Sequence, residues 1–158
     1  MRKLKIGLLG TGIIIRNSHI LTLINNPLAE LVAVGNLHQD SLRKIADDFK
    51  IPKTYTDFAE MAADPDIDAV VNALPNYLHA PVTIQMLKTG KHVLCEKSIS
   101  LSYNSARKII KECKKNNVRI MENFTFQLHP QHKKILELIK KNIIGDIQTL
   151  SAKYGFTL

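Results

Sequence analysis

Short apolar runs recur along the chain, and polar-apolar segments of helical length lie between them. The runs are "KIGLL", "ELVAVG", "DAVVNAL", "HVLC" and "VRIME". Strands that are this continuously apolar are covered on both faces, which is typical of parallel sheets sandwiched by helices. The pattern therefore predicts an α/β fold with a doubly wound parallel sheet.

The clearest predicted helix follows Ser102, a suitable N-cap. Ala106, Ile109, Ile110 and Cys113 recur at i, i+3, i+4 and i+7, and charged residues occupy the other side. This spacing predicts that these four side chains face inward.

A second regular helix is predicted over residues 130–141, with Ile135, Leu138 and Ile139 inward and Gly145 shortly after its end. The stretch "IQTLSAKYGFTL" then reads as a strand by its β-branched and aromatic content. A parallel sheet completed by "VRIME" has no need of either element. We therefore expect a Rossmann-type domain over residues 1–122 and the truncated start of an α+β domain over residues 123–158.

Length and composition are those of a globular chain with one proper core: 158 residues, 45% hydrophobic and 23% charged. The opening "MRKLKIGLLGTGIII" runs into "RNSH" without a small-residue cleavage site, so it predicts a buried strand rather than a secretory signal. No apolar run approaches the ~20 residues that span a bilayer. Only Cys95 and Cys113 are present, which does not indicate a disulfide framework and favours a cytoplasmic location.

The formal net charge of +8 raises the possibility of nucleic-acid binding. However, the lysines of "KECKKNN" and "KKILELIKKN" alternate with apolar positions at helical spacing, and no aromatic residues are interleaved with them for base stacking. The charge therefore indicates a weakly attractive field for an anionic ligand, without nucleic acid or membrane as a partner.

A G-x-G turn formed by Gly10 and Gly12 follows the first predicted strand. Gly10 permits a tight turn, Gly12 lets the backbone approach a pyrophosphate, and the next helix presents its N-terminus to it. Ile15 stands where a third glycine or alanine would ease packing. The alternative is a strand-helix turn that binds nothing.

The cofactor preference is open at the end of the second predicted strand, where a carboxylate would accept the ribose hydroxyls. Asn36, Leu37 and His38 stand there instead, and Asp40 is expected to cap the next helix. Because Asn36 and Leu37 neither repel nor bind a 2'-phosphate strongly, we expect less discrimination between NAD and NADP than an acid or an arginine would give.

Two later segments also end at the predicted ligand edge of the sheet. Pro75, Asn76 and His79 follow "DAVVNAL", although Asn76 could equally be an N-cap and His79 a surface residue. After "HVLC", Glu96 and Lys97 place a cation in the crevice, with Glu96 able to hold Lys97 in place. The alternative is a surface ion pair worth ~0 to 1 kcal/mol.

Taken in order, "GLLGTG", "LPNYLHAP" and "GKHVLCEKSIS" resemble the glucose-fructose oxidoreductase, inositol dehydrogenase and rhizopine catabolism family, Gfo/Idh/MocA. The similarity continues through "MENFTFQLHPQHKKILELI" and "IGDIQTLSAKYGF". The resemblance implies a Rossmann domain that binds NAD or NADP, followed by an α+β domain that carries a polyhydroxy substrate and often builds homodimers.

The resemblance also implies site residues. Lys97 is the expected catalytic residue, which orients the substrate hydroxyl and stabilises a developing alkoxide. No metal is implied. The implied cofactor-binding residues are Gly10, Thr11, Gly12, Ile13, Asn36, Leu37, Leu74, Pro75, Asn76, His79, Glu96, Lys97 and Asn123.

Several positions depart from the family pattern. Ser98 replaces a proline, Gln127 an arginine and Leu128 a phenylalanine. The family's general acid/base, a histidine with a nearby aspartate, would lie beyond Leu158. The leading hypothesis is thus an NAD(P)-dependent oxidoreductase of a sugar, cyclitol or similar compound, inactive as residues 1–158 alone. The alternative is a non-catalytic dinucleotide-binding module or a truncated remnant.

Overall fold

The computed structural model describes residues 2–153 and residue 155. The chain divides into two compact units, Met1–Asn123 and Phe124–Leu158. Each unit is described by itself.

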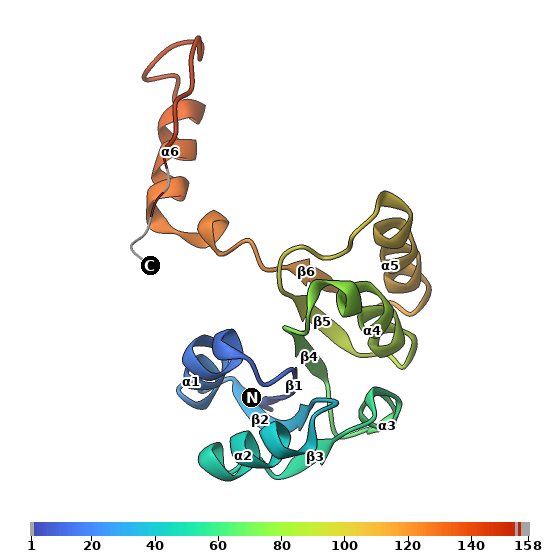
Figure 1. Ribbon diagram of the computed structural model, residues 1–158. Helices are drawn as coiled ribbons and strands as arrows, with labels where there is room; N and C mark the ends of the chain where they lie inside the picture. The colour runs from blue at the N-terminus through green and yellow to red at the C-terminus, as the bar shows by residue number, and fades with distance from the viewer. Residues whose placement is uncertain (1, 154, 156–158) are drawn as a thin grey trace. The chain divides into compact units, whose positions relative to one another are not determined.

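The first unit is built on a six-stranded parallel sheet with the order β3-β2-β1-β4-β5-β6 (Figure 1). The order reverses between β1 and β4, which in sheets of this kind opens a ligand crevice at the carboxyl ends of the strands. The strands are β1 Leu4–Leu9, β2 Ala29–Gly35, β3 Lys53–Tyr55, β4 Ala69–Asn72, β5 His92–Cys95 and β6 Ile120–Glu122.

Helices cover both faces of this sheet, as the apolar runs predicted. Along β1, Leu8 packs with one helical layer and Leu9 with the other, and Val71 and Val70 divide in the same way along β4. One layer holds α3 Phe58–Ala63, α4 Asn76–Lys88 and α5 Tyr103–Lys115, and the other holds the π-helix η1 Ile15–His19, α1 Ile20–Ile24 and α2 Gln39–Phe49. The predicted doubly wound Rossmann-type fold is therefore confirmed.

Strand β3 was not predicted from the sequence. It has only three residues, Lys53, Thr54 and Tyr55, and lies at the edge of the sheet against β2. An edge strand of this length carries no continuous apolar run, so its pairing with β2 is what identifies it.

Helix α5 begins where the sequence predicted, because the Ser102 side chain accepts a hydrogen bond from the backbone N–H of Ser105 at 3.2 Å. Ile109 and Cys113 are buried, but Ile110 is 46% exposed, so its predicted inward position is wrong. Successive residues are about 100° apart around a helix, and the buried stripe is centred on Ile109.

Both cysteines are free thiols in the core. Burial raises the pKa of Cys95 to about 12, which keeps its thiol protonated.

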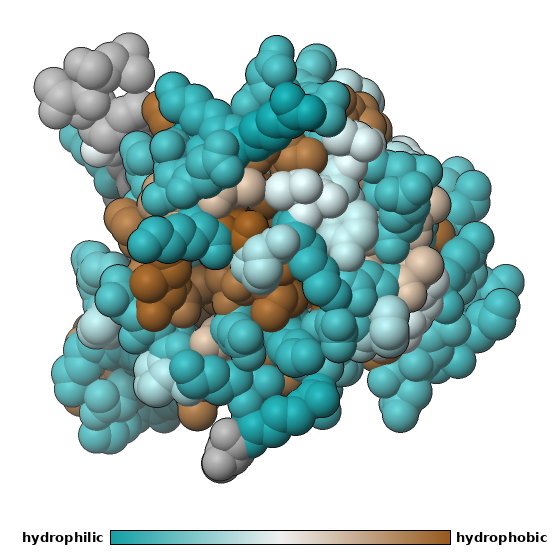
Figure 2. Space-filling view, turned by 90° about the horizontal axis from the view of Figure 1, so that it is seen from below, coloured by the Kyte–Doolittle hydropathy of each residue, from teal (hydrophilic) through white to brown (hydrophobic). Residues whose placement is uncertain are grey.

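Hydrophilic side chains cover most of the face shown in Figure 2. On the face shown in Figure 2, apolar side chains gather in the middle and polar side chains surround them. In the first unit, Leu4, Leu21, Ile24 and Leu28 are each at least half exposed. No helix in the described part of the chain is long and apolar enough to cross a membrane.

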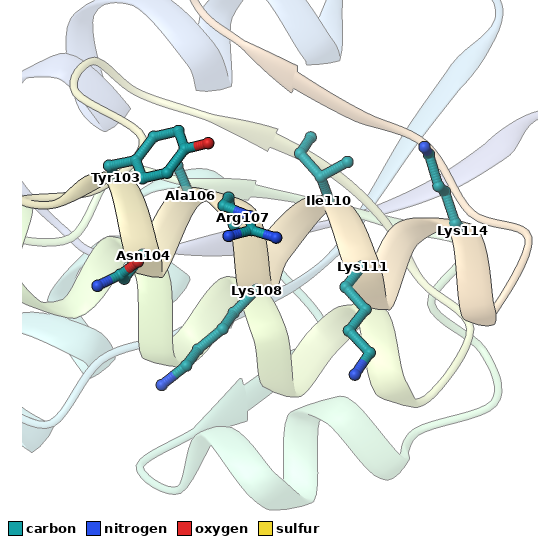
Figure 3. Close-up of a pocket in the computed structure, with 8 residues that line it drawn as sticks. All are labelled: Tyr103, Asn104, Ala106, Arg107, Lys108, Ile110, Lys111 and Lys114. Carbon is teal, nitrogen blue, oxygen red and sulfur yellow. The ribbon is translucent and has the colours of Figure 1, made fainter.

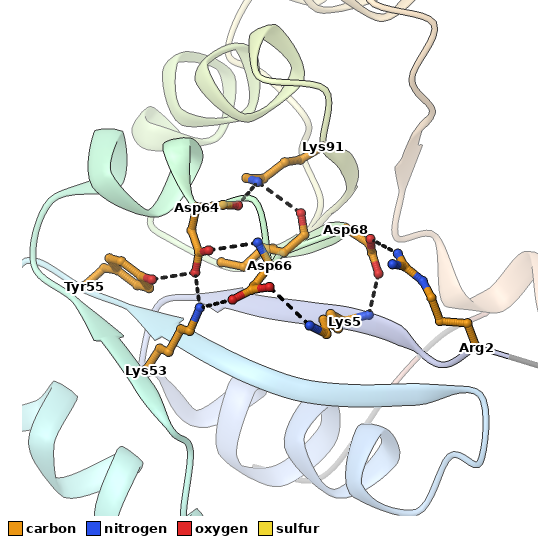
Figure 4. Close-up of polar contacts among 9 residues, drawn as sticks. Arg2, Lys5, Lys53, Tyr55, Asp64, Asp66, Asp68 and Lys91 are labelled. Atoms are coloured by element: carbon orange, nitrogen blue, oxygen red, sulfur yellow. Dashed lines mark hydrogen bonds and ion pairs between the residues drawn. The ribbon is translucent and has the colours of Figure 1, made fainter.

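An ion network ties the amino ends of the strands together (Figure 4). Lys53 bridges Asp64 at 2.9 Å and Asp66 at 2.8 Å, and the Tyr55 hydroxyl donates to Asp64 at 2.6 Å. Although burial by itself raises the pKa of Asp64, hydrogen bonds from Tyr55 and Lys53 outweigh it and lower that pKa to about 2.

Lys91, the lysine of "GKHV", is buried at this amino edge rather than at the ligand edge. Its ammonium donates to the backbone carbonyls of Asp64 at 2.5 Å and Ile67 at 3.0 Å, and the residue is 4% exposed. Burial lowers the pKa of Lys91. Its role here is therefore to satisfy two carbonyl groups and join the turn after α3 to β5.

The second unit contains the short 3-10 helix η2 Thr125–Leu128 and helix α6 Pro130–Lys140. The predicted helix over 130–141 is confirmed, and His129 accepts from the backbone N–H of Gln131 at its start. No residue of α6 is buried, and Ile135 is 43% exposed, so its predicted inward position is wrong within the described residues.

The strand predicted in "IQTLSAKYGFTL" is wrong for residues 147–153, which form no strand. A β-strand needs a neighbouring strand for its hydrogen bonds, and the described part of this unit contains none. Tyr154 and residues 156–158 of the prediction lie outside the described residues.

Candidate cofactor and catalytic site

The turn after β1 requires glycine at its first position. Gly10 has φ +107°, and a Cβ added there would lie 2.9 Å from the carbonyl oxygen of Ala73. Its backbone N–H donates to the carbonyl of Gly35 at 2.8 Å, which ties the turn to the end of β2. On the other side, the N–H of Ala73, which follows β4, donates to the carbonyl of Leu9 at 3.0 Å, so both neighbouring strands hold the start of the turn.

Gly12 has a different reason to be glycine. A Cβ added at Gly12 would meet nothing within 4 Å. Packing against the described residues therefore does not require a glycine at this position. The helical segment begins at once, since the N–H of Arg16 donates to the Gly12 carbonyl at 3.1 Å. Open space beside free N–H groups fits the pyrophosphate of a dinucleotide. Ile15, which stands at the position of the third glycine, is fully buried in the core. The fold therefore accommodates the larger side chain at this position.

Polar side chains join the glycine turn to the end of β2. The Asn36 amide nitrogen donates to the Thr11 hydroxyl at 2.7 Å and to the Ser41 hydroxyl at 2.8 Å. The predicted capping role of Asp40 is wrong, because His38 is the N-cap of α2 and Asp40 lies in its first turn.

These segments border a groove of about 660 Å³ at the carboxyl edge of the sheet. Six of the expected cofactor-binding residues line it, whereas Ile13 and Leu37 are 72% and 56% exposed on the segments beside it. The lining residues are Gly10, Thr11, Gly12, Asn36, His38, Asp40, Ser41, Ala73, Leu74 and Pro75.

A larger hollow of about 790 Å³ lies along α5 (Figure 3). Its described lining residues all come from this one helix and include Arg107, Lys108, Lys111 and Lys114. No side chains from other described elements converge on it, so we place the functional site at the groove by the glycine turn.

His79 connects the ends of β4 and β5 from inside the protein. It is 1% exposed, so the surface interpretation is wrong. Its Nδ1 lies 2.6 Å from the Ser98 carbonyl and its Nε2 lies 2.7 Å from the Leu74 carbonyl. A charged ring donates to both carbonyls and a neutral ring to one.

The alternative interpretation of Asn76 as an N-cap is also wrong, since Asn76 is already the first residue of α4 and Pro75 is the cap.

The Glu96 carboxylate is held by side chains other than that of Lys97. Its Oε1 lies 2.8 Å from Nε2 of His19 and accepts from the Asn123 amide at 2.7 Å. Burial raises the pKa of Glu96, but these hydrogen bonds outweigh it and the net direction is downward. Among the described residues Glu96 makes no ion pair with Lys97, so that prediction is wrong.

The loop that carries Lys97 is fixed at the two residues that follow it, Ser98 and Ile99. The N–H of Ile99 donates to the Glu122 carboxylate at 2.7 Å, and His79 lies against the Ser98 carbonyl. The Lys97–Ser98 peptide bond is cis. These contacts constrain the backbone around Lys97, while the polar contacts described for the loop do not engage its ammonium group.

Sequence reasoning missed His19 and Glu122. Glu122 ends the run "VRIME" and pairs with Cys95 across β5 and β6, so an acid closing an apolar run was the available signal. His19 gave no comparable signal, because its partner Glu96 is 77 residues away. Among the described residues, no group of three or more His, Cys, Asp or Glu side chains could hold a metal ion.

A doubly wound parallel sheet with a glycine turn and an open groove at its switch point defines a dinucleotide-binding Rossmann domain. The profile of the Gfo/Idh/MocA family, described as "Oxidoreductase family, NAD-binding Rossmann fold", matches residues 4–124. The chain belongs to this family, and its cofactor is NAD or NADP.

Known relatives agree with this assignment. The chain is 32% identical to trans-1,2-dihydrobenzene-1,2-diol dehydrogenase of Xenopus laevis, over 96% of this chain and 46% of that protein. It is 30% identical to myo-inositol 2-dehydrogenase of Thermotoga maritima, over 90% and 42%. A 3-ketoreductase from Actinomadura kijaniata, solved with NADP and TDP-benzene, superposes with a TM-score of 0.83 and 26% identity, over 93% of this chain and 45% of that one. The chain thus spans less than half the length of these proteins.

Proposed function

We propose that this chain is the cofactor-binding part of an NAD(P)-dependent dehydrogenase or reductase of a sugar, cyclitol or similar polyhydroxy compound. The observation that carries the proposal is the open glycine turn at Gly12, at the same sheet edge as the fixed loop of Lys97. The names of the relatives, which include a diol and an inositol dehydrogenase, support the substrate class.

Within this proposal each segment holds one part of the cofactor. Gly10, Thr11, Gly12 and Ile13 hold the pyrophosphate, since they form the turn and the start of the helix. The remaining assignments follow the strand ends from β2 to β6: Asn36 and Leu37 at the adenosine ribose, Leu74, Pro75, Asn76 and His79 along the cofactor, and Glu96, Lys97 and Asn123 near the nicotinamide.

The nicotinamide supplies the hydride acceptor or donor when it is bound. Lys97 presents its ammonium group to the reacting hydroxyl and stabilises the negative charge that develops on that oxygen. Because the Glu96 carboxylate is engaged by His19 and Asn123, it does not neutralise Lys97. The charge of Lys97 is therefore directed at the substrate.

We assign the proton acceptor, the remaining substrate contacts and homodimer formation to the second, α+β domain that begins near Asn123. In the first unit, His79 is bonded through both ring nitrogens, and His19 is bonded to Glu96. Residues 1–158 by themselves should therefore bind the cofactor without turning over a polyol.

Calorimetric titration of residues 1–158 with NAD⁺, NADH, NADP⁺ and NADPH tests the cofactor role. We expect saturable binding of at least one form. Absence of binding by all four, with the protein shown to be folded by circular dichroism, would contradict the proposed function.

The role of Lys97 requires a catalytically active form of the protein. Lys97→Ala should lower kcat by about 10²–10³-fold, as loss of a group that stabilises developing charge does, and change cofactor affinity less than threefold. Lys97→Arg, which keeps the charge, is the control and should retain more turnover. Normal turnover by Lys97→Ala would show that Lys97 plays no part in the chemistry.

A further inference from the structure

The hydrogen bonds at the end of β2 have a defined polarity in the cluster formed by Thr11, Asn36 and Ser41. The Ser41 hydroxyl lies 2.9 Å from the carbonyl of His38, which can only accept, so Ser41 donates its proton there. Ser41 therefore accepts from the Thr11 hydroxyl, at 3.2 Å. Neither hydroxyl has a proton left for a ligand.

This polarity also orients the Asn36 side chain. Because the Thr11 and Ser41 oxygens can only accept from it, the amide presents its nitrogen to both, at 2.7 and 2.8 Å. A rotated amide would set its oxygen against two hydroxyls whose protons are already used. Both amide hydrogens are thus engaged, and Oδ1 of Asn36 is the remaining group of the cluster.

The acceptor that remains, Oδ1 of Asn36, interacts differently with NAD and with NADP. The 2'-hydroxyl of NAD carries a proton that it can donate to Oδ1 of Asn36. A 2'-phosphate at neutral pH carries mainly acceptor oxygens and negative charge, and the cluster has no donor left to offer it.

The carboxylate that lines the groove acts in the same direction, although the imidazole of His38, which also lines it, can donate a hydrogen bond to a phosphate. Asp40, in the first turn of α2, lines the groove and repels a phosphate. None of the described lining residues is a lysine or arginine, and nearby Arg16 is paired with Asp48 at 2.8 Å. The positive end of the α2 dipole, worth about 0.3–1 kcal/mol at an exposed site, offsets part of this repulsion.

We propose that Asn36, oriented by Thr11 and Ser41, together with Asp40, makes this site select NAD(H) over NADP(H). The inference rests on the proposed cofactor function and adds which dinucleotide the site takes. It makes the earlier expectation of limited discrimination more specific, because that expectation treated Asn36 as neutral and Asp40 as a helix cap.

The test is titration of residues 1–158 with NADH and NADPH at about 0.15 M salt, where the Debye length is ~8 Å and the net positive charge contributes little. We expect NADH to bind about 10- to 100-fold more tightly; tenfold corresponds to about 1.4 kcal/mol. Equal affinities, or tighter binding of NADPH, would overturn the inference while leaving the cofactor role intact. Failure of both to bind would overturn both.

Two variants separate the contributions. Asp40→Asn should tighten NADPH at least threefold with little change for NADH, whereas the control Asp47→Asn, which removes the same charge elsewhere on α2, should not change the ratio. Asn36→Ala should weaken NADH at least threefold and NADPH less than twofold. Thermal melting establishes that each variant is folded. An unchanged ratio in both Asp40→Asn and Asn36→Ala would show that neither residue sets the preference.

Discussion

At the residue scale, Gly10 and Gly12 are glycines for different reasons, and substitution separates them. Gly12→Val places its side chain in open space, so the free energy of unfolding should stay within about 0.5 kcal/mol of the wild type. The same change should abolish dinucleotide binding, because the methyl groups occupy the space of the pyrophosphate. Thermal melting and calorimetric titration of the one variant check both statements.

Gly10→Val is the matched comparison. Its positive φ and the 2.9 Å approach to the Ala73 carbonyl should make it destabilising by about 2 kcal/mol or more. If Gly12→Val unfolded the protein as readily as Gly10→Val, or bound NAD(H) normally, Gly12 would have no special relation to the ligand.

At the element scale, strand β6 positions the loop that follows β5. Glu122→Ala removes the acceptor of the Ile99 N–H and should cost about 1.5–3 kcal/mol, the range for a hydrogen bond to a charged group. The Ile99 amide should then exchange at least tenfold faster in an NMR measurement. Glu122→Gln keeps an acceptor oxygen and should remain close to the wild type. Equal exchange in all three proteins would show that this contact does not hold the loop.

The network at the amino edge of the sheet predicts a pH dependence. The pKa of Asp64 is lowered to about 2 in the folded protein, so its carboxylate stabilises the fold fully above pH ~4. This contribution is lost as the pH falls towards 2. Asp64→Asn should lower the free energy of unfolding by about 1–2 kcal/mol at pH 7, after allowance for solvent screening, and by progressively less between pH 4 and 2. Urea unfolding at several pH values measures this, and a difference independent of pH would contradict it.

At the scale of the whole molecule, the two units differ in how much of each is buried. The first has two hydrophobic clusters on either side of its sheet, whereas none of residues 124–153 is buried. Hydrogen exchange should therefore protect the amides of β1, β4 and β5 at least about 10³-fold more than those of α6, since protection follows burial and cooperative packing. Strong protection of α6 in a monomer would show that it packs on a surface of its own chain. Protection that rises with concentration would instead indicate self-association.

The sequence by itself determined the features that depend on local chemistry. Five of the six strands were visible as apolar runs, the Ser102 cap and the start of α6 were visible as helix signals, and the glycine turn was visible as a turn between a strand and a helix. These features depend on residues within a few positions of one another, so the sequence pattern alone is enough to predict them.

The tertiary structure alone decided which side chains meet. Glu96 takes His19 and Asn123 rather than its neighbour Lys97, and Glu122 reaches Ile99 only because β6 pairs with β5. The donor polarity at Asn36 likewise depends on Ser41 and Thr11 approaching it from two other segments. In a parallel sheet the strand ends that form a site are separated in sequence by whole crossover helices, and their contacts leave no periodic signal along the chain.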